Sequence, residues 1–246
     1  MIKKSFIFLE RISNKKEQAI HRQNINDWND FLKAPKIRGI NLLKKAYYDR
    51  QIHEAQKALL EEKSYFFINR LPQKEMWRLY DEFKDQACFL DIEIGSDGKV
   101  ILVGISNYYR TNTFICNINL DKSLLEKELQ KYKLLITFNG SAFDLPKLKK
   151  ELQIEIKIPH IDLKPLCVNL NLKGGLKEVE KILNLKRPPH LNGNPVDLWK
   201  AYHASGDKEY LDLMIQYNNE DIENLKGVME YVYKELSNKM IVLSTA

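Results

Sequence analysis

The stretch Cys88-Phe89-Leu90-Asp91-Ile92-Glu93-Ile94 places two acidic residues inside an apolar run that is typical of a buried strand. In an extended chain, side chains two residues apart point to the same face. Asp91 and Glu93 are therefore expected to project together, with the aliphatic residues on the opposite face. Two neighbouring carboxylates on a buried strand repel each other and are poorly hydrated, so they need a compensating cation or proton. The stretch thus predicts a site for a divalent metal ion.

A second Asp-x-Glu sequence occurs much later, at Asp221-Ile222-Glu223. It lies in a helical pattern, where residues two apart diverge around the helix axis and cannot hold one ion between them. Only the copy on the predicted strand has the geometry of a shared metal site.

The size and composition of the chain set the broad class of protein. It has 246 residues, of which 44% are hydrophobic, enough to bury a substantial core. The longest apolar stretch, Val100–Ile105, is far too short to cross a membrane, and the first nine residues are too short for a secretory signal. The three cysteines are widely spaced, which supports neither a disulfide framework nor a zinc ribbon. We therefore expect a cytoplasmic protein with no membrane partner.

The positive charge is concentrated near the N-terminus. Residues 1–90 hold 18 Lys and Arg against 12 Asp and Glu, whereas residues 91–246 hold 21 of each class. Such asymmetry suits a nucleic-acid-facing extension on a neutral catalytic body. A solvated, lysine-rich helical surface explains the charge equally well.

The hydrophobic periodicity predicts two regions. Residues 1–80 read as a helical N-terminal extension, and residues 86–238 as an α/β domain. The helices expected in and just after the extension are Lys15–Gln23, Asp27–Leu32, Ile40–Ala46, Ile52–Glu62 and Glu75–Phe83.

The second region predicts a mixed sheet of five strands flanked by helices. The expected strands are Cys88–Ile94, Val100–Ser106, Thr113–Asn119, Leu134–Phe138 and Ile156–Asp162. The first three are joined by short turns, which indicates an antiparallel meander, and the later strands alternate with helices. The expected helices are Asp121–Tyr132, Asp144–Leu152, Gly175–Leu183, Pro195–Tyr202 and Asp207 to about Lys234, with a loop at Lys186–Asn194.

Further polar residues are expected near the acidic strand. The strand Leu134–Phe138 ends in the turn Asn139-Gly140, which places Asp144 at the start of the next helix, where it could also be only an N-cap. Tyr217 and Asp221 are four residues apart and share one helix face. That face also carries apolar residues, so Asp221 should point inward and needs a partner.

These residues resemble a known family when they are taken in order. Asp91, Glu93, Asp144 and Asp221, with Tyr217 four residues before the last acid, resemble the DnaQ-like exonucleases, the DEDD branch of the ribonuclease-H-like superfamily. The spacing is that of the tyrosine subtype, because the histidine subtype would carry histidine at the position of Gln216.

Four motifs look like those of the YprB-type prokaryotic subgroup. They are Phe89–Glu93, Thr137–Asp144, His160–Leu163 and Tyr217–Asp221, and the resemblance covers about residues 86–236.

The resemblance implies a metal-dependent 3′–5′ exonuclease that acts on DNA or RNA, with a single-stranded 3′ end as the expected substrate. Two divalent ions, Mg²⁺ or Mn²⁺, would be held by Asp91, Glu93, Asp144 and Asp221. Tyr217 would orient the attacking water, since an unperturbed phenol with a pKa of about 10 is a poor base at neutral pH.

The role of the turn residues is less determined. Asn139 and Phe143 are candidates for contact with the substrate, although Asn139 could equally well cap the turn. Asp162 is expected either to support the metal ligands or to cap a strand end. Lys186, Arg187 and His190 could contact phosphates, with a solvated loop as the default reading.

Two other functions stay open at this stage. The same ion geometry would serve an endonuclease that cuts hybrids or structured DNA, and a fold of this kind can also carry a non-catalytic nucleic-acid-binding protein. The presence of all four acids argues against the second.

The start of the chain, Phe8–Glu17, looks like a degenerate helix-hairpin-helix motif. Glycines in such a hairpin let backbone N–H groups approach phosphates, and here Arg11 and Ser13 stand where glycine is expected. The extension is therefore expected either to bind nucleic acid or to serve as a structural arm.

Overall fold

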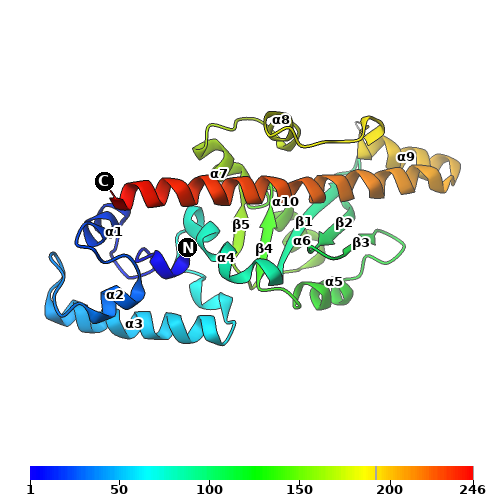
Figure 1. Cartoon of the computed structure of the whole chain (residues 1–246). Helices are drawn as coiled ribbons and strands as arrows, with labels where there is room; N and C mark the ends of the chain where they lie inside the picture. The colour runs from blue at the N-terminus through cyan, green and yellow to red at the C-terminus, as the bar shows by residue number, and fades with distance from the viewer. Residues whose placement is uncertain (192, 246) are drawn as a thin grey trace. The chain divides into compact units, whose positions relative to one another are not determined.

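The computed structural model describes residues 1–191 and 193–245, and the side chains of those residues up to 240 (Figure 1). The chain divides into two compact units. One comprises Met1–Lys84 with the segment from Tyr233 onward, and the other comprises Asp85–Val232. None of the described helices is long and apolar enough to cross a bilayer.

A five-stranded sheet forms the second unit and confirms the predicted mixed topology. Its strands are β1 (Ala87–Ile94), β2 (Val100–Ser106), β3 (Thr111–Ile115), β4 (Leu134–Thr137) and β5 (His160–Asp162). Their order is β3-β2-β1-β4-β5. β1 pairs antiparallel with β2, and β2 with β3, whereas β4 runs parallel to both β1 and β5. β1 is therefore the strand at which the meander meets the parallel half.

β1 and β4 differ from the prediction by one residue each, and β3 and β5 differ by more. β3 ends at Ile115, not Asn119, because the Asn119 side chain accepts a hydrogen bond from the Ile115 N–H and closes a turn, in which Asn117 has a φ of 62°. β5 begins at His160, directly after Pro159, which has no N–H to donate to a ladder.

The helices of this unit are α5 (Lys122–Leu129), α6 (Asp144–Leu152), α7 (Leu163–Asn169), α8 (Leu176–Ile182), α9 (Pro195–Ser205) and the part of α10 (Lys208–Thr245) that ends at Val232. The helix α7 was not expected from the sequence pattern. This helix starts directly after β5, where the Asp162 side chain accepts a hydrogen bond from the Lys164 N–H and caps it.

The two faces of the sheet have separate apolar cores. Leu90 and Ile92 of β1 belong to a core that includes residues of α5 and α6. Leu102 of β2 belongs to a second core, with Met214 of α10, against which Trp199 of α9 packs. Because Asp91 and Glu93 alternate with Leu90 and Ile92, the acids lie on the face covered by α10.

The helices of the first unit are α1 (Asn14–His21), α2 (Trp28–Lys33), α3 (Leu42–Leu60) and α4 (Tyr80–Phe83), with short 3₁₀ turns η1 (Ile2–Lys4), η2 (Ser64–Phe67), η3 (Gln73–Leu79) and η4 (Lys84–Gln86). The prediction of two helices within Ile40–Glu62 is wrong. α3 is continuous because Tyr48, Ile52 and Ala55 recur at helical spacing on its buried face. The helix predicted from Glu75 is instead η3 followed by α4.

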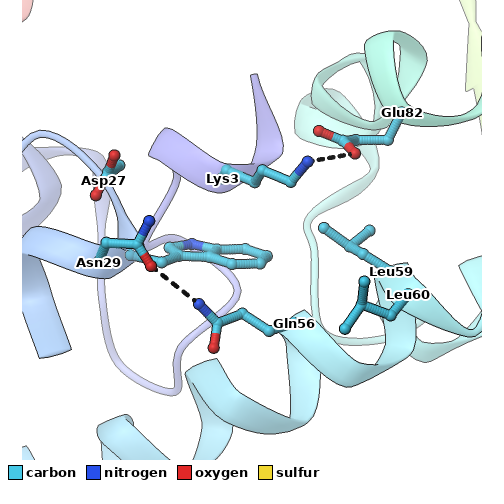
Figure 2. Close-up of a pocket in the computed structure, with 8 residues that line it drawn as sticks. Lys3, Asp27, Asn29, Gln56, Leu59, Leu60 and Glu82 are labelled. Atoms are coloured by element: carbon cyan, nitrogen blue, oxygen red, sulfur yellow. Dashed lines mark hydrogen bonds and ion pairs between the residues drawn. The ribbon is translucent and has the colours of Figure 1, made fainter.

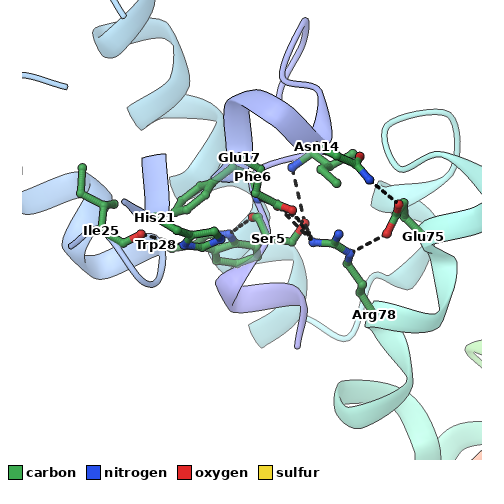
Figure 3. A network of polar contacts seen from close by, with 10 residues as sticks. Ser5, Phe6, Asn14, Glu17, His21, Ile25, Trp28, Glu75 and Arg78 are labelled. Carbon is green, nitrogen blue, oxygen red and sulfur yellow. Dashed lines mark hydrogen bonds and ion pairs between the residues drawn. The ribbon is translucent and has the colours of Figure 1, made fainter. Parts of the chain in front are cut away.

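A buried arginine network organises the core of the first unit (Figure 3). Arg78 pairs with Glu17 and Glu75, at 2.9 Å in each case, and also donates to the Ser5 hydroxyl. Glu17 in turn accepts the Phe6 N–H at 2.6 Å. Every charge in this network has a partner, so it reads as a structural element and not as a reactive site.

The predicted hairpin opening has a left-handed residue at one of its two expected glycine positions. Arg11 has a φ of 62°, in the left-handed region that favours glycine. Ser13 is the N-cap of α1, with its side chain accepting a hydrogen bond from the Lys16 N–H. Arg11 therefore has the backbone of a glycine position, whereas Ser13, with a φ of −90°, does not, and the hairpin stays a prediction.

A cavity of about 450 Å³ also lies in the first unit (Figure 2). Its polar rim is internally paired, because Lys3 donates to Glu82 at 2.8 Å and Gln56 donates to Asn29 at 3.3 Å. Its remaining lining residues are Asp27, Trp28, Leu59 and Leu60.

Candidate metal centre and active site

Three carboxylates from two elements converge on one point. Asp91 and Glu93 come from β1 and Asp221 comes from α10, and each offers an oxygen within 4.8 Å of the others. The two acids of the strand project to one face, as the period of an extended chain requires. A register shift between Glu93 and Ile94 ends the regular pairing with β2 beside these acids. Such irregularities often occur next to functional sites, where they redirect a side chain.

Asn218 fixes the position of Asp91. Its Nδ2 donates to Asp91 Oδ2 at 2.8 Å, and its side chain is fully buried. Hydrogen bonding by Asn218 also lowers the pKa of Glu93, although burial outweighs it. One amide of α10 therefore serves both acids of the strand.

Gly104 makes this approach possible. It pairs with Asp91 in the β1–β2 register, and a Cβ built there would lie 1.9 Å from Asn218 Oδ1. Any other residue at this position would push Asn218 away from the strand. The glycine is required here by close approach, not by backbone conformation.

Asp144 lies at the start of α6, in the turn that follows β4. The N-cap of this helix is Phe143, so Asp144 is not the cap, and its side chain is buried. Asp144 is outside the three-residue cluster, but its charge raises the pKa of both Asp91 and Glu93. The acid is therefore close enough to act on the cluster electrostatically.

Asp162 holds the turn that presents Asp144. Its two carboxylate oxygens accept the N–H groups of Asn139 at 2.7 Å and of Ser141 at 3.0 Å. It also caps α7, so the capping role expected from the sequence is present, and support of metal ligands stays a prediction. Asn139 has a φ of 68°, and Gly140 approaches Thr137 so closely that a Cβ would lie 2.1 Å from its Oγ1.

Burial raises the pKa of four acids, Asp91, Glu93, Asp144 and Asp221. The pKa of Glu93 rises to about 8, mainly through desolvation and then through the charge of Asp221. Desolvation likewise raises the pKa of Asp144 to about 7 and that of Asp221 to about 6. The pKa of Asp91 rises well above its usual range, through burial and then through the charge of Glu93. These carboxyls share negative charge that the fold only partly neutralises.

The donor set fits a divalent cation. Glu93 Oε1 is buried and accepts no hydrogen bond from any residue that the structure describes. An orphaned carboxylate oxygen, close to oxygens of two further carboxylates, is what a hard ion such as Mg²⁺ or Mn²⁺ binds. A cation there would satisfy the oxygen and lower the mutual repulsion together.

Two cations flank Tyr217, one turn before Asp221 on α10. Lys177 Nζ lies 4.8 Å from the centre of the Tyr217 ring, and the Arg187 guanidinium lies 5.4 Å from it. The ring is 8% exposed, and burial followed by the charge of Asp221 raises the pKa of the phenol. Tyr217 therefore stays protonated at neutral pH and is a hydrogen-bond donor, not a base.

The position of Arg187 differs from the solvated loop that the sequence predicts. The default prediction was solvation, and Lys186 and His190 are indeed exposed. Arg187 instead turns inward, with its side chain 8% exposed, and pairs with Glu180 and Asp221.

The remaining predicted substrate contacts lie on the turn before α6. Asn139 is half-buried, and Phe143 is 36% exposed. Both stay predictions, because their role depends on a substrate.

Sequence reasoning missed Gly104 and Asn218, and it named Arg187 only as a possible phosphate contact. Gly104 carried a signal, since a glycine inside a strand often marks a close backbone approach. Asn218 carried a weaker one, because it follows Tyr217 and is polar in a helix with a buried face. Arg187 carried none beyond its charge, since its partners are 7 and 34 residues away.

Comparison with known proteins places the chain in a family. Residues 88–233 match the RNase_H_2 family, described as the RNase_H superfamily. The chain therefore belongs to the RNase_H superfamily, and its sheet has the ribonuclease-H-like topology.

Other comparisons are more distant. No curated protein sequence matches the chain. A solved structure, the family B DNA polymerase from the hyperthermophilic archaeon Pyrobaculum calidifontis, is similar with a TM-score of 0.48 and 16% identity. The similarity covers 59% of this chain and 24% of the polymerase.

Proposed function

We propose that this chain is a metal-dependent nuclease that hydrolyses phosphodiester bonds. The observation that carries the proposal is the convergence of Asp91, Glu93 and Asp221, with one orphaned carboxylate oxygen among them. Membership of the RNase_H superfamily supports it, because acidic clusters on this sheet suit divalent-metal chemistry.

Each residue has a distinct role in this proposal. Asp91, Glu93 and Asp221 hold the divalent ions, and Asp144 adds charge from the adjoining turn. Two bound ions would activate a water molecule and stabilise the attacking and leaving oxygens of the phosphodiester. Tyr217, which stays protonated, donates a hydrogen bond that orients the attacking water.

A cationic group near the acids supports a phosphate-containing substrate. Lys177 is half-buried on α8, and its charge lowers the pKa of Glu93 and of Asp221, so its ammonium lies within electrostatic reach of both. A phosphodiester oxygen is a natural partner for such a group at the mouth of an acidic site.

The finer proposal is a 3′–5′ exonuclease of the DnaQ-like, tyrosine subtype, with two Mg²⁺ or Mn²⁺ ions. The order of the four acids and the position of Tyr217 four residues before Asp221 support it. A single-stranded 3′ end is the proposed substrate, and Asn139 and Phe143 are its proposed contacts.

A labelled-oligonucleotide assay tests this proposal. Single-stranded DNA, duplex DNA and RNA, each labelled at the 5′ end, are incubated with Mg²⁺, Mn²⁺ or a chelator. A ladder that shortens from the 3′ end supports an exonuclease. A single internal product would instead identify an endonuclease, and loss of all products with chelator is required in either case.

Matched variants assign the activity to the cluster. Asp221→Asn should abolish hydrolysis without loss of folding. Asp212→Asn is the control, because Asp212 is an exposed aspartate on the same helix. Equal turnover in the two variants would remove Asp221 from the proposed mechanism.

A further inference from the structure

Arg187 occupies an unusual place beside the acidic cluster. Its Nε donates to Glu180 Oε2 at 3.0 Å and its Nη2 donates to Glu180 Oε1 at 2.7 Å, a bidentate pair. The same Nη2 also donates to Asp221 Oδ1. The exposed fractions of the three side chains are 8% for Arg187, 4% for Glu180 and 12% for Asp221. A loop residue has therefore been drawn into a nearly dry site and fixed there.

The Asp221 carboxylate could therefore interact with two positive charges, the guanidinium of Arg187 and a divalent cation. Asp221 is one of the three acids whose oxygens lie within 4.8 Å of one another. The guanidinium already neutralises part of it, and the positive charge of Arg187 lowers the pKa of both Asp91 and Asp221. A divalent ion held by the same carboxylate would face a fixed positive charge a few ångströms away, at low dielectric. The ion and Arg187 are thus linked through one carboxylate.

We propose that Arg187, anchored by Glu180, is a positioning residue that acts as the internal counter-ion of Asp221 and sets how tightly the site takes a divalent cation. The inference rests on the proposed metal site and deepens it. Arg187 competes with the cation for Asp221, and Glu180 limits that competition by taking most of the guanidinium's hydrogen bonds.

The loss of Glu180 and the loss of Arg187 should change the affinity for the cation in opposite directions. Glu180 accepts two hydrogen bonds from Arg187, whereas Asp221 accepts one. Without Glu180, the full charge of Arg187 would turn to Asp221, and one negative charge near the ion would also be lost. Both effects weaken cation binding. Without Arg187, Asp221 would be free and Glu180 would add uncompensated negative charge, and both effects strengthen cation binding.

A titration with Mn²⁺ tests this linkage on the full chain. Isothermal titration calorimetry with the metal alone compares the unchanged protein with Arg187→Met and Glu180→Gln. Arg187→Met should bind Mn²⁺ about tenfold more tightly or better, as removal of one nearby like charge predicts. Glu180→Gln should bind it several-fold more weakly. Arg110→Met is the control and should change nothing, because Arg110 is 53% exposed and pairs with Glu128 outside the cluster.

Opposite signs separate this role from a merely structural one. If the pair only supports the fold, both variants should bind Mn²⁺ more weakly or alike. Unchanged or weaker binding by a folded Arg187→Met, checked by circular dichroism, overturns the inference. If that variant does not fold, the neutral Arg187→Gln takes its place, and unchanged or weaker Mn²⁺ binding by folded Arg187→Gln overturns the inference as well.

A third variant and the unchanged protein complete the design. Arg187→Lys keeps the charge but loses the bidentate geometry, so its affinity should lie closer to that of the unchanged protein than to that of Arg187→Met. The failure of the proposed function is distinguishable, because it would appear as absence of Mn²⁺ uptake by the unchanged protein itself.

Discussion

Replacing Gly104 by alanine tests how the acidic strand and α10 are fitted together. The new Cβ would lie 1.9 Å from Asn218 Oδ1 and 2.5 Å from Ile222 Cδ1. Neither atom can stay where it is, since both belong to buried side chains of one helix. The substitution adds a single carbon, yet it must displace the residue that donates to Asp91.

The expected loss of stability follows from three contributions. Overpacking by one carbon in a close-packed core costs about 1–3 kcal/mol. Weakening of the Asn218 hydrogen bond to a charged carboxylate, now 2.8 Å long, costs up to about 1.5–3 kcal/mol. Alanine restricts the unfolded chain and returns about 0.4–1 kcal/mol. The free energy of unfolding should therefore fall by roughly 1.5–5.5 kcal/mol.

Urea unfolding followed by circular dichroism measures this difference. Gly193→Ala is the matched control, because a Cβ at Gly193 meets no atom within 4 Å. It should change the free energy of unfolding by less than about 0.5 kcal/mol. If Gly104→Ala proves as stable as Gly193→Ala, Asn218 does not need the space of a glycine, and the argument for its approach to the strand is wrong.

Three further outcomes follow from the same geometry. Tyr217→Phe should lower the rate of hydrolysis by about 100-fold and leave Mn²⁺ affinity unchanged, because only the orientation of water is lost; unchanged kinetics would make the phenol a bystander. The pKa of Glu93 is about 8 in the folded chain against 4.5 for a free side chain, so the folded state holds the extra proton between these values. Metal-free stability should therefore fall as pH rises through that window, and a melting temperature that rises instead contradicts the assigned burial. Asp162→Asn leaves one acceptor oxygen for the two N–H groups of the turn, so stability should drop by about 1–2 kcal/mol in thermal unfolding, with an unaltered midpoint as the contrary result.

The local parts of the site could be read from the sequence. Two acids at a spacing of two within an apolar run must lie on the same face of a buried strand, and Asp91 and Glu93 do so on β1. Tyr217 and Asp221 follow in the same way from helical spacing, since α10 buries both. The turn signals also gave the antiparallel meander, because short connections leave few alternatives.

The long-range parts of the site could not be read in this way. Asn218 meets Asp91 across 127 residues of sequence, and Arg187 meets Asp221 across 34. Nothing in the periodicity of a segment records which distant side chain will neutralise it. The errors in the extension have a related origin, since α3 stays continuous through the packing of its buried face and not through any local signal.

Charge compensation links the local and the long-range parts of the site. The sequence of the strand indicates that a positive or hydrogen-bonding group must offset its two acids, but it does not identify that group. In the folded chain the Asn218 amide donates to Asp91, and the Arg187 guanidinium pairs with Asp221. Glu93 Oε1 has no hydrogen-bond partner among the described residues. Such partial compensation lowers the repulsion among the acids in the metal-free fold. It also leaves enough uncompensated charge, concentrated at one oxygen, for a divalent ion to bind. Complete neutralisation by protein groups would have given a stable core without a reason to take up metal.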